Sequence, residues 1–150
     1  MRYWEDFEVG ETAEVGPVTV SEADIIEFAS KYDPQPFHLD AEAASKTMYG
    51  GLIASGWHTS ALYMGMYVRG ALADTASLGA PGVEIRWTKP VRPGDSLTGS
   101  SVVTELQPSS SDPRRGTVCV EHEVRNQDGV VVMTLRSRGM IARRPESLSP

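Results

Sequence analysis

The segment that most constrains the fold of this chain is residues 55–73, which is apolar around most of a helical circumference. Leu62, Met66 and Val68 contribute to this surface, and Gly65 would permit close approach of a neighbouring element. A helix that is apolar nearly all round is buried on several sides. The pattern therefore predicts a long helix over Ser55–Ala73 that packs against other elements on more than one face.

A membrane span is the alternative that the apolar run Leu52–Val68 raises. A spanning helix needs roughly 20 predominantly apolar residues. This run is shorter, and Ser55, His58 and Ser60 interrupt it. A buried helix in a globular protein is the better interpretation, and we expect no membrane partner.

The rest of the chain shows mainly strand patterns. A first strand is predicted over residues 12–20, broken at Gly16-Pro17, and Ser21 is predicted to cap a helix over residues 21–31. The later strands are predicted at Val83–Trp87, Ser96–Gln107, Thr117–Arg125 and Val130–Arg138. The last two flank a hairpin signal with Asp128-Gly129 at its tip. A helix-rich half followed by several antiparallel strands predicts the α+β class.

A length of 150 residues indicates one domain, residues 1–150, with enough chain to bury a core. Residues 145–150 are expected to form a disordered tail. The first residues turn acidic at once, so no secretory signal is predicted. Cys119 is the only cysteine, which excludes an intramolecular disulfide and fits a reducing, cytoplasmic location.

The net charge of −6 is distributed unevenly along the chain. Residues 1–50 hold three basic and eleven acidic side chains, whereas residues 51–150 hold eleven basic and nine acidic ones. No basic run interleaved with aromatic residues appears, so nucleic acid is not expected as a partner. Arg86, Lys89 and Arg92 are candidates for binding a small anion, and a solvated surface explains the same charges.

One short segment brings a carboxylate and an imidazole together: Tyr32-Asp33-Pro34-Gln35-Pro36-Phe37-His38. Each proline fixes its own φ and disfavours helical geometry for the residue before it, so Asp33 and Gln35 are not expected to be helical. The segment is predicted to be a stiff extended turn that holds an acid/base pair in fixed geometry. The simpler alternative is a turn-starting aspartate and a half-buried histidine without a catalytic role.

Residues 33–38, with Leu39-Asp40 and Ala43-Ala44 after them, resemble the hydratase motif of the MaoC-like dehydratases, which include the (R)-specific enoyl-CoA hydratases. The likeness continues at Gly51–Gly56 and Lys89–Asp95, in the order of that family. It implies a hotdog fold, in which an antiparallel sheet wraps around a long central helix. It also implies at least a homodimer.

Three positions depart from the family pattern. Gln35 replaces the usual asparagine, and Tyr32 replaces the glycine often found before the aspartate. Met64 stands where some hydratases have a serine that hydrogen-bonds the aspartate, which leaves the orientation of Asp33 open.

The resemblance implies a hydro-lyase that adds water to, or removes it from, the 2,3 position of an acyl-CoA thioester. In that reading Asp33 and His38 hold and activate the water, and the Gly56 N–H stabilises the thioester oxyanion. The alternative for Gly56 is a glycine needed only for the turn from loop to helix. The substrate-binding candidates are Gln35, Phe37, Ser55, Trp57 and Trp87, with His58 as a further possibility. Core packing is the alternative for His58 and both tryptophans.

Coenzyme A is expected only as part of the substrate, without a further cofactor. No metal is expected, because the histidines at positions 38, 58 and 122 do not form a ligand-spaced cluster with Cys119.

Two other functions stay open. Hotdog thioesterases hydrolyse the same thioesters but usually use a carboxylate on the central helix, and Ser55–Ala73 contains no Asp or Glu. A non-catalytic acyl-CoA-binding protein would keep the motif without turnover. Acyl length, the choice between CoA and an acyl carrier protein, and the direction of the reaction do not follow from the sequence.

Overall fold

The computed structural model describes residues 1–148 of the chain. Its helices and strands confirm the α+β class. In chain order they are η1 Trp4–Asp6, β1 Thr12–Thr19, α1 Glu22–Tyr32, α2 Pro36–Leu39, α3 Ala41–Ser45, α4 Gly56–Arg69, β2 Val83–Trp87, β3 Ser96–Pro108, β4 Arg115–Arg125, β5 Val131–Ala142 and η2 Pro145–Leu148.

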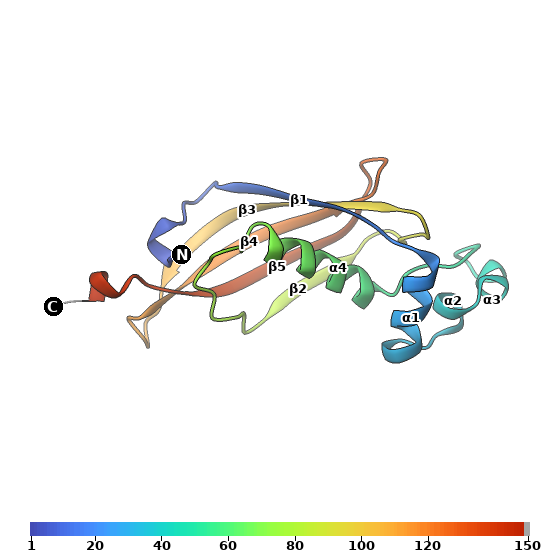
Figure 1. Ribbon diagram of the computed structural model, residues 1–150, viewed down its shortest axis with the longest axis horizontal. Coiled ribbons are helices and arrows are strands. Elements are labelled where there is room, and N and C mark those ends of the chain that lie inside the picture. Colours follow the sequence, from blue (N-terminus) through green and yellow to red (C-terminus); the bar gives the residue numbers. More distant parts are fainter. Residues whose placement is uncertain (149–150) are drawn as a thin grey trace.

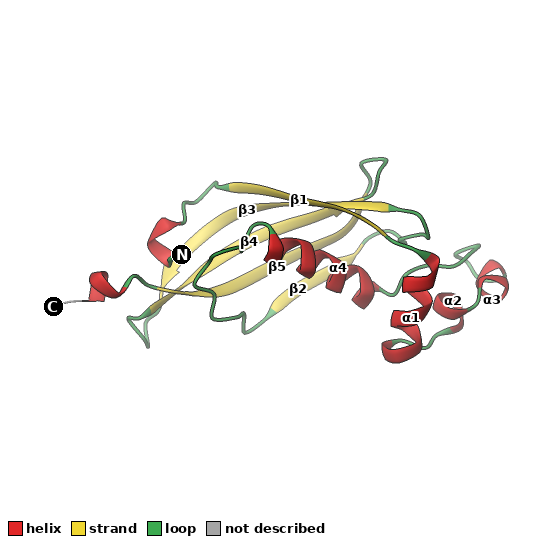
Figure 2. Cartoon of the chain, viewed as in Figure 1, coloured by secondary structure: helices red, strands yellow, loops and turns green. Residues whose placement is uncertain are grey.

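A five-stranded antiparallel sheet forms the body of the molecule, with its strands in the order β1-β3-β4-β5-β2. Helix α4 lies along one face of the sheet, and α1, α2 and α3 gather at one end of it (Figure 1). The N-terminus and the last described residues lie at the opposite end (Figure 2). Strand β2 is at the edge of the sheet and pairs with β5.

Several predicted elements and caps are found at their predicted places. Strand β2 coincides with Val83–Trp87. Ser21 caps α1, since its hydroxyl accepts a hydrogen bond of 3.1 Å from the Asp24 N–H. The Asp40 carboxylate likewise caps α3 by accepting two backbone N–H bonds. Side chains that compete for backbone donors thus begin both helices, and the Ser21 cap lies where the sequence predicts it.

Strand lengths depend on pairing partners that local patterns do not reveal. In β1 the register against β3 shifts between Val15 and Val18, at the predicted break. Strand β5 extends to Ala142 rather than ending at Arg138, because β4 continues beside it and pairs Arg115 with Ala142.

Helix α4 is shorter than predicted. It ends at Arg69 rather than Ala73, and Gly70 follows as the C-cap residue. A Cβ on Gly70 would lie 2.8 Å from Cγ1 of Val15, so β1 approaches this position too closely for a side chain.

One face of α4 is buried, not several. Tyr63 and Met66 point into the core between the helix and the sheet. The opposite face carries exposed apolar residues at helical spacing, which we call the α4 stripe: Trp57, Ala61, Met64 and Val68. The prediction that α4 is covered on several sides is therefore wrong for the single chain.

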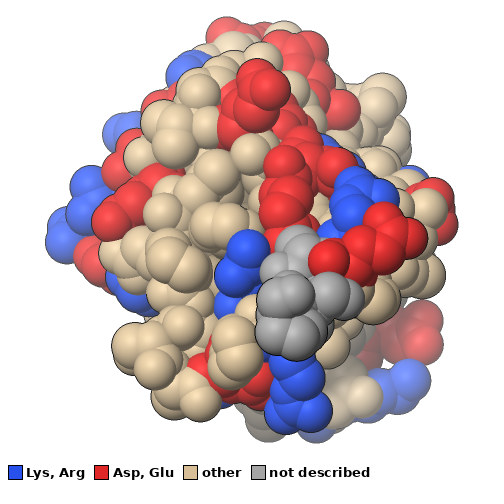
Figure 3. All heavy atoms as spheres, turned by 90° about the vertical axis from the view of Figure 1, so that its left-hand side faces the viewer, with Lys and Arg blue, Asp and Glu red and all other residues tan. Residues whose placement is uncertain are grey.

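Charge pairs join the two ends of the chain. Arg143 Nε lies 2.8 Å from Glu5 Oε1, and Arg144 Nη2 lies 2.6 Å from Asp6 Oδ1. Figure 3 shows acidic and basic side chains side by side on this end of the molecule. Residues 145–148 form η2, so the predicted disorder is wrong there, and residues 149–150 lie outside the described part of the chain.

Candidate active site

The segment with the carboxylate and the imidazole connects α1 to α2 at one end of the sheet. Asp33 is the C-cap residue of α1 (φ −154°, ψ 68°) and Gln35 is extended (φ −85°, ψ 141°). Neither is helical, as the prolines predict. Pro36 then begins α2. A proline is tolerated there because the N–H it lacks would have no hydrogen-bond partner within the helix. The prediction of an extended turn is therefore wrong for the second half of the segment, since His38 lies in this short helix.

Three side chains hold the Asp33 carboxylate. Its Oδ1 accepts a 2.7 Å hydrogen bond from Gln35 Nε2. Its Oδ2 accepts a 2.7 Å bond from Ser55 Oγ and lies 3.2 Å from His38 Nε2. Burial opposes ionisation, but the bonds from Gln35 and Ser55, together with His38, outweigh it and lower the pKa of Asp33. Asp33 is therefore a fixed carboxylate at neutral pH.

Ser55 supplies the hydroxyl that orients Asp33. Met64 stands where some hydratases have a serine that hydrogen-bonds the aspartate, but here it lies on the exposed α4 stripe. Ser55 is fully buried and is not among the residues that line the pocket in front of Asp33. Ser55 was expected to bind substrate, whereas its observed contact is with the carboxylate.

The tautomer of the buried His38 follows from its contacts. Nδ1 lies 2.7 Å from the backbone oxygen of Ile53. Because a carbonyl oxygen only accepts, Nδ1 carries the proton. In the neutral ring, Nε2 then keeps a free lone pair on the side of Asp33. An imidazole in this state can accept a proton from water, and the carboxylate stabilises the charged ring that results.

Helix α4 begins at Gly56 and directs its N-terminus toward the same pocket. The first N–H groups of a helix have no partner within the helix. Ser55, at the N-cap position, makes no side-chain cap because its hydroxyl is bonded to Asp33. A Cβ on Gly56 would lie 2.5 Å from the Trp87 ring, so packing against the indole also requires glycine here.

These groups meet at an open pocket of about 470 Å³. The predicted site residues in its wall are Asp33, Gln35, Phe37, His38, Gly56, Trp57 and Trp87. The two indoles meet edge to face with ring centroids 5.1 Å apart. They are 59% and 44% exposed, so core packing does not account for them.

The pocket wall includes residues that no sequence pattern marked. Tyr49 lies in a loop and packs against Phe37, with ring centroids 5.4 Å apart. Thr59 lies one turn into α4 and faces the same space. Both are ordinary residues of their segments, and the folded chain alone brings them to the site.

His58 lies outside the pocket. Its ring stacks on Phe28 of α1 with centroids 4.8 Å apart, and its Nδ1 is buried without a hydrogen-bond partner among the described residues. Burial lowers the pKa of His58, although Asp24 opposes this. The packing alternative therefore describes His58.

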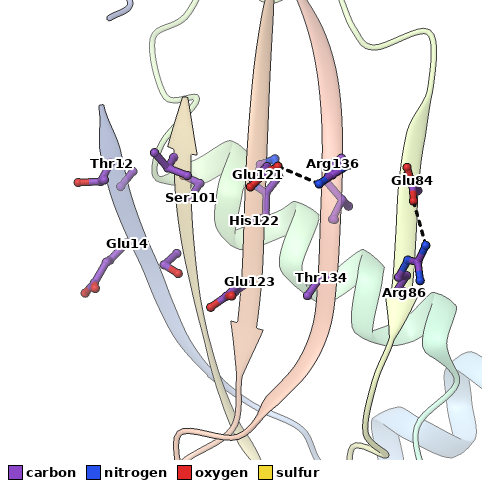
Figure 4. A pocket seen from close by; sticks show the side chains of 14 residues that line it. Thr12, Glu14, Glu84, Arg86, Ser101, Glu121, His122, Glu123, Thr134 and Arg136 are labelled. Atoms are coloured by element: carbon purple, nitrogen blue, oxygen red, sulfur yellow. Dashed lines mark ion pairs between the residues drawn. The ribbon is translucent and has the colours of Figure 1, made fainter. Parts of the chain in front are cut away.

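The three candidate cations separate in the fold. Arg86 faces away from α4 (Figure 4) and lies 3.5 Å from Glu84. Arg92 donates a 3.3 Å hydrogen bond to the Gly51 carbonyl and holds the loop before α4. Lys89 lines the pocket. Of these three, Lys89 is the one placed to meet an anion there.

A second hollow, of about 660 Å³, lies on the outer face of the sheet, away from α4 (Figure 4). Four of its charged side chains form pairs: Arg136 lies 3.2 Å from Glu121, and Arg86 lies 3.5 Å from Glu84. All four are at least half exposed. Solvent screens such pairs, so this face offers no activated acid or base.

Within residues 1–148, no three His, Cys, Asp or Glu side chains are grouped so that they would share a metal ion. Nor does any helix in that part of the chain have the length and apolar character needed to cross a membrane.

Two curated relatives carry names that describe an activity. One is the (R)-specific enoyl-CoA hydratase of Rhodospirillum rubrum, 29% identical over 125 residues, with 79% of this chain and 81% of that protein covered. The other is the 3-hydroxybutyryl-CoA dehydratase of Methylorubrum extorquens, 34% identical over 122 residues, with 78% and 73% covered.

The fold is also similar to solved structures. The crystal structure of a MaoC-like dehydratase from Rhodospirillum rubrum matches with a TM-score of 0.89 and 41% identity, covering 95% of this chain and 98% of that one. This confirms the predicted hotdog arrangement of a sheet around a central helix. A family model described as MaoC like domain matches residues 6–126. By this match and by its similarity to the dehydratase structure, the chain belongs to the MaoC-like dehydratase family.

Proposed function

We propose that this chain is a hydro-lyase that adds water to the 2,3 double bond of an acyl-CoA thioester, or removes it in the reverse direction. The observation that carries the proposal is the pair Asp33 and His38, with Oδ2 and Nε2 3.2 Å apart in the wall of an open pocket. The names of the hydratase and dehydratase relatives support the same reaction class.

In the hydration direction, a water held between Asp33 Oδ2 and His38 Nε2 attacks C3 of the enoyl thioester. Because Nε2 holds the free lone pair, it takes one proton from this water as the C3–O bond forms. The Asp33 carboxylate accepts a hydrogen bond from the other O–H of the water and so orients it. The electron pair of the double bond moves to the carbonyl oxygen, giving an enolate. Return of the proton to C2 completes the addition of one water, and no other reactant is consumed.

The enolate oxygen requires a donor that is already in place, and we assign this role to the Gly56 N–H. Gly56 is the first residue of α4 and lines the pocket, at the positive end of the helix dipole. Phe37, Trp57 and Trp87 supply an apolar wall for the acyl group, and Lys89 suits the anionic part of coenzyme A. The Gln35 amide serves Asp33 rather than the substrate.

Hydrolysis of the thioester is the competing reaction. A thioesterase of this fold would use a carboxylate on the central helix, and α4 contains none. The carboxylate of this pocket is Asp33, which precedes α2 and is paired with an imidazole. This arrangement favours hydration. A non-catalytic acyl-CoA-binding protein would share the pocket and differ in turnover.

The test follows enoyl absorbance and free thiol together during incubation with crotonyl-CoA. We expect absorbance to fall without thiol release, and Asp33→Asn or His38→Ala to reduce the rate by about 100-fold or more. Glu27→Gln removes an exposed carboxylate of α1 that pairs with Lys31, and it should keep the wild-type rate. Thiol release would identify a thioesterase. Binding without either signal, for short, long and branched enoyl substrates, would identify a binding protein.

We also propose that two copies pair through β2 and the α4 stripe. Strand β2 has an unpaired edge, and its residues Val83 and Trp87 are 49% and 44% exposed. An open strand edge beside an exposed apolar surface favours association. Light scattering should give the mass of two chains for the wild type and of one for Val83→Lys. A wild-type mass of one chain would contradict the proposal.

A further inference from the structure

Two separate cavities lie between α4 and the sheet, and α4, β2 and β5 border both. At the catalytic pocket the bordering residues of these elements include Gly56, Trp87 and Val132. A second cavity, of about 250 Å³, lies further along the same three elements, where the bordering residues include Met64, Val83 and Leu135. The two cavities therefore follow one another along α4.

Three side chains fill the interval between the cavities. Trp87 Nε1 donates a 3.1 Å hydrogen bond to Ser60 Oγ, which in turn lies 3.4 Å from Met133 Sδ. On α4 and β5, Ser60 and Met133 each fall between the residues that border the two cavities. We call these three residues the partition. Met133 belongs to the buried core, whereas the Trp87 indole is half exposed and closes the partition at the sheet edge.

The Trp87 indole is held in this position from three sides. Its ring lies against the Cα of Gly56, where a Cβ would come within 2.5 Å. Trp57 meets it edge to face, and Ser60 Oγ accepts a hydrogen bond from its N–H. An aromatic ring fixed in this way limits the catalytic pocket on the side toward the second cavity.

The second cavity suits an aliphatic group. Its described wall is apolar apart from a few uncharged polar residues, and it contains no charged side chain. Tyr63 OH lies 2.7 Å from His122 Nδ1, and His122 Nε2 lies 2.8 Å from Ser137 Oγ, so these polar groups bond to one another. Because one water takes about 30 Å³ in the liquid, 250 Å³ holds a chain of several carbon atoms.

We propose that Trp87 determines the acyl-chain length that the active site accepts. With the indole in place, the catalytic pocket ends at the partition and favours short acyl groups. Without it, the pocket opens into the second cavity, which then takes the tail of a longer acyl chain. This inference rests on the proposed function, since it takes acyl-CoA as the ligand of the catalytic pocket.

The test measures the affinities of butyryl-CoA and octanoyl-CoA, which are saturated and cannot be hydrated, by titration calorimetry. We expect the wild type to bind butyryl-CoA more tightly. Trp87→Ala should shift the ratio of the two dissociation constants toward octanoyl-CoA by about tenfold or more, because added methylene groups enter an apolar cavity. A ratio taken within one protein is insensitive to a general weakening of the site. The kcat/KM values for crotonyl-CoA and octenoyl-CoA should shift in the same direction.

Two further variants locate the tail. Leu135→Phe, at a buried position in the wall of the second cavity, is introduced together with Trp87→Ala. It narrows that cavity and should restore the preference for butyryl-CoA. Glu84 lies on the same strand as Trp87 but faces away from α4 (Figure 4). Glu84→Ala should therefore leave the ratio of the two dissociation constants unchanged. Should Trp87→Ala fail to fold, Trp87→Leu carries the same expectation.

An unchanged ratio in a folded Trp87 variant of wild-type mass would overturn the proposal, as would a wild type that prefers octanoyl-CoA. A gain in octanoyl-CoA affinity that Leu135→Phe does not remove would place the acyl tail elsewhere and would also overturn the proposal. Proteins that show the predicted binding ratios but hydrate neither enoyl-CoA would refute the proposed reaction and support the role of Trp87.

Discussion

His38 and His122 are both buried and each is hydrogen-bonded through at least one ring nitrogen, yet they occupy different kinds of site. His38 donates from Nδ1 to the Ile53 carbonyl and turns Nε2 toward Asp33. His122 lies between Tyr63 OH and Ser137 Oγ, at 2.7 and 2.8 Å. Burial and hydrogen bonding alone would not tell the two apart.

Charge and access distinguish the two histidines. Asp33 is a carboxylate of lowered pKa that lies 3.2 Å from His38 Nε2, and both residues line an open pocket. His122 has hydroxyl partners, and burial lowers its pKa to about 4. Both of its nitrogens are bonded within the protein, so neither is left for a water. A nearby counter-charge and a free nitrogen, rather than hydrogen bonding as such, make a histidine an acid/base group.

Replacing each imidazole in turn should reveal the largest difference between the two histidines. His38→Gln should lower kcat/KM for crotonyl-CoA by about 10²- to 10⁴-fold, because the proposed proton acceptor is lost. His122→Gln should leave the rate per folded molecule nearly unchanged. Initial rates normalised to the folded fraction measure both. An equal loss in the two variants would show that the buried network takes part in the reaction.

Acid should destabilise the protein through His122 before it affects Asp33. The unfolded imidazole has a pKa near 6.5 and the folded one about 4, so the unfolded state binds more protons between these values. The free energy of unfolding therefore falls as the pH drops from 6.5 to 4, by on the order of 3 kcal/mol from this group. Asp33, whose folded pKa is lowered, contributes stability that is lost only below its ordinary value of 3.8.

Urea unfolding of wild type and His122→Gln between pH 7 and pH 4 measures this difference. The variant should lose less stability over the interval, and the contribution of His58 cancels because both proteins retain it. Parallel pH dependence in the two proteins would contradict a neutral, buried His122.

The smallest effect is expected from the hydroxyl behind Asp33. Ser55→Ala removes one hydrogen bond to the carboxylate and should lower kcat/KM by about tenfold. It should also move the acidic limb of the pH–rate profile to higher pH, because the bond lowers the pKa of Asp33. Ser30→Ala, which removes an exposed hydroxyl bonded within α1, is the matched control. An unshifted acidic limb would mean that Ser55 does not tune Asp33.

Much of the candidate site could be predicted because it depends on local rules. Prolines exclude helical geometry at Asp33 and Gln35, so α1 has to end before the carboxylate. The apolar pattern over Ser55–Ala73 predicted the start of α4 to within one residue, and the observed helix begins at Gly56. The link from Ser55 to Asp33 was not predictable, since 22 residues separate them and no pattern marks the pairing.

Local sequence patterns are sufficient to predict the α+β class, the strand at Val83–Trp87 and the proximity of Asp33 to His38. Each depends on side-chain periodicity or on backbone restrictions within a few residues. The exposed apolar face of α4, the contact of Trp87 with Gly56 and the uncharged surroundings of His122 appear only in the folded chain. These properties arise from contacts between distant segments, whose free energies depend on packing and burial that no local pattern records.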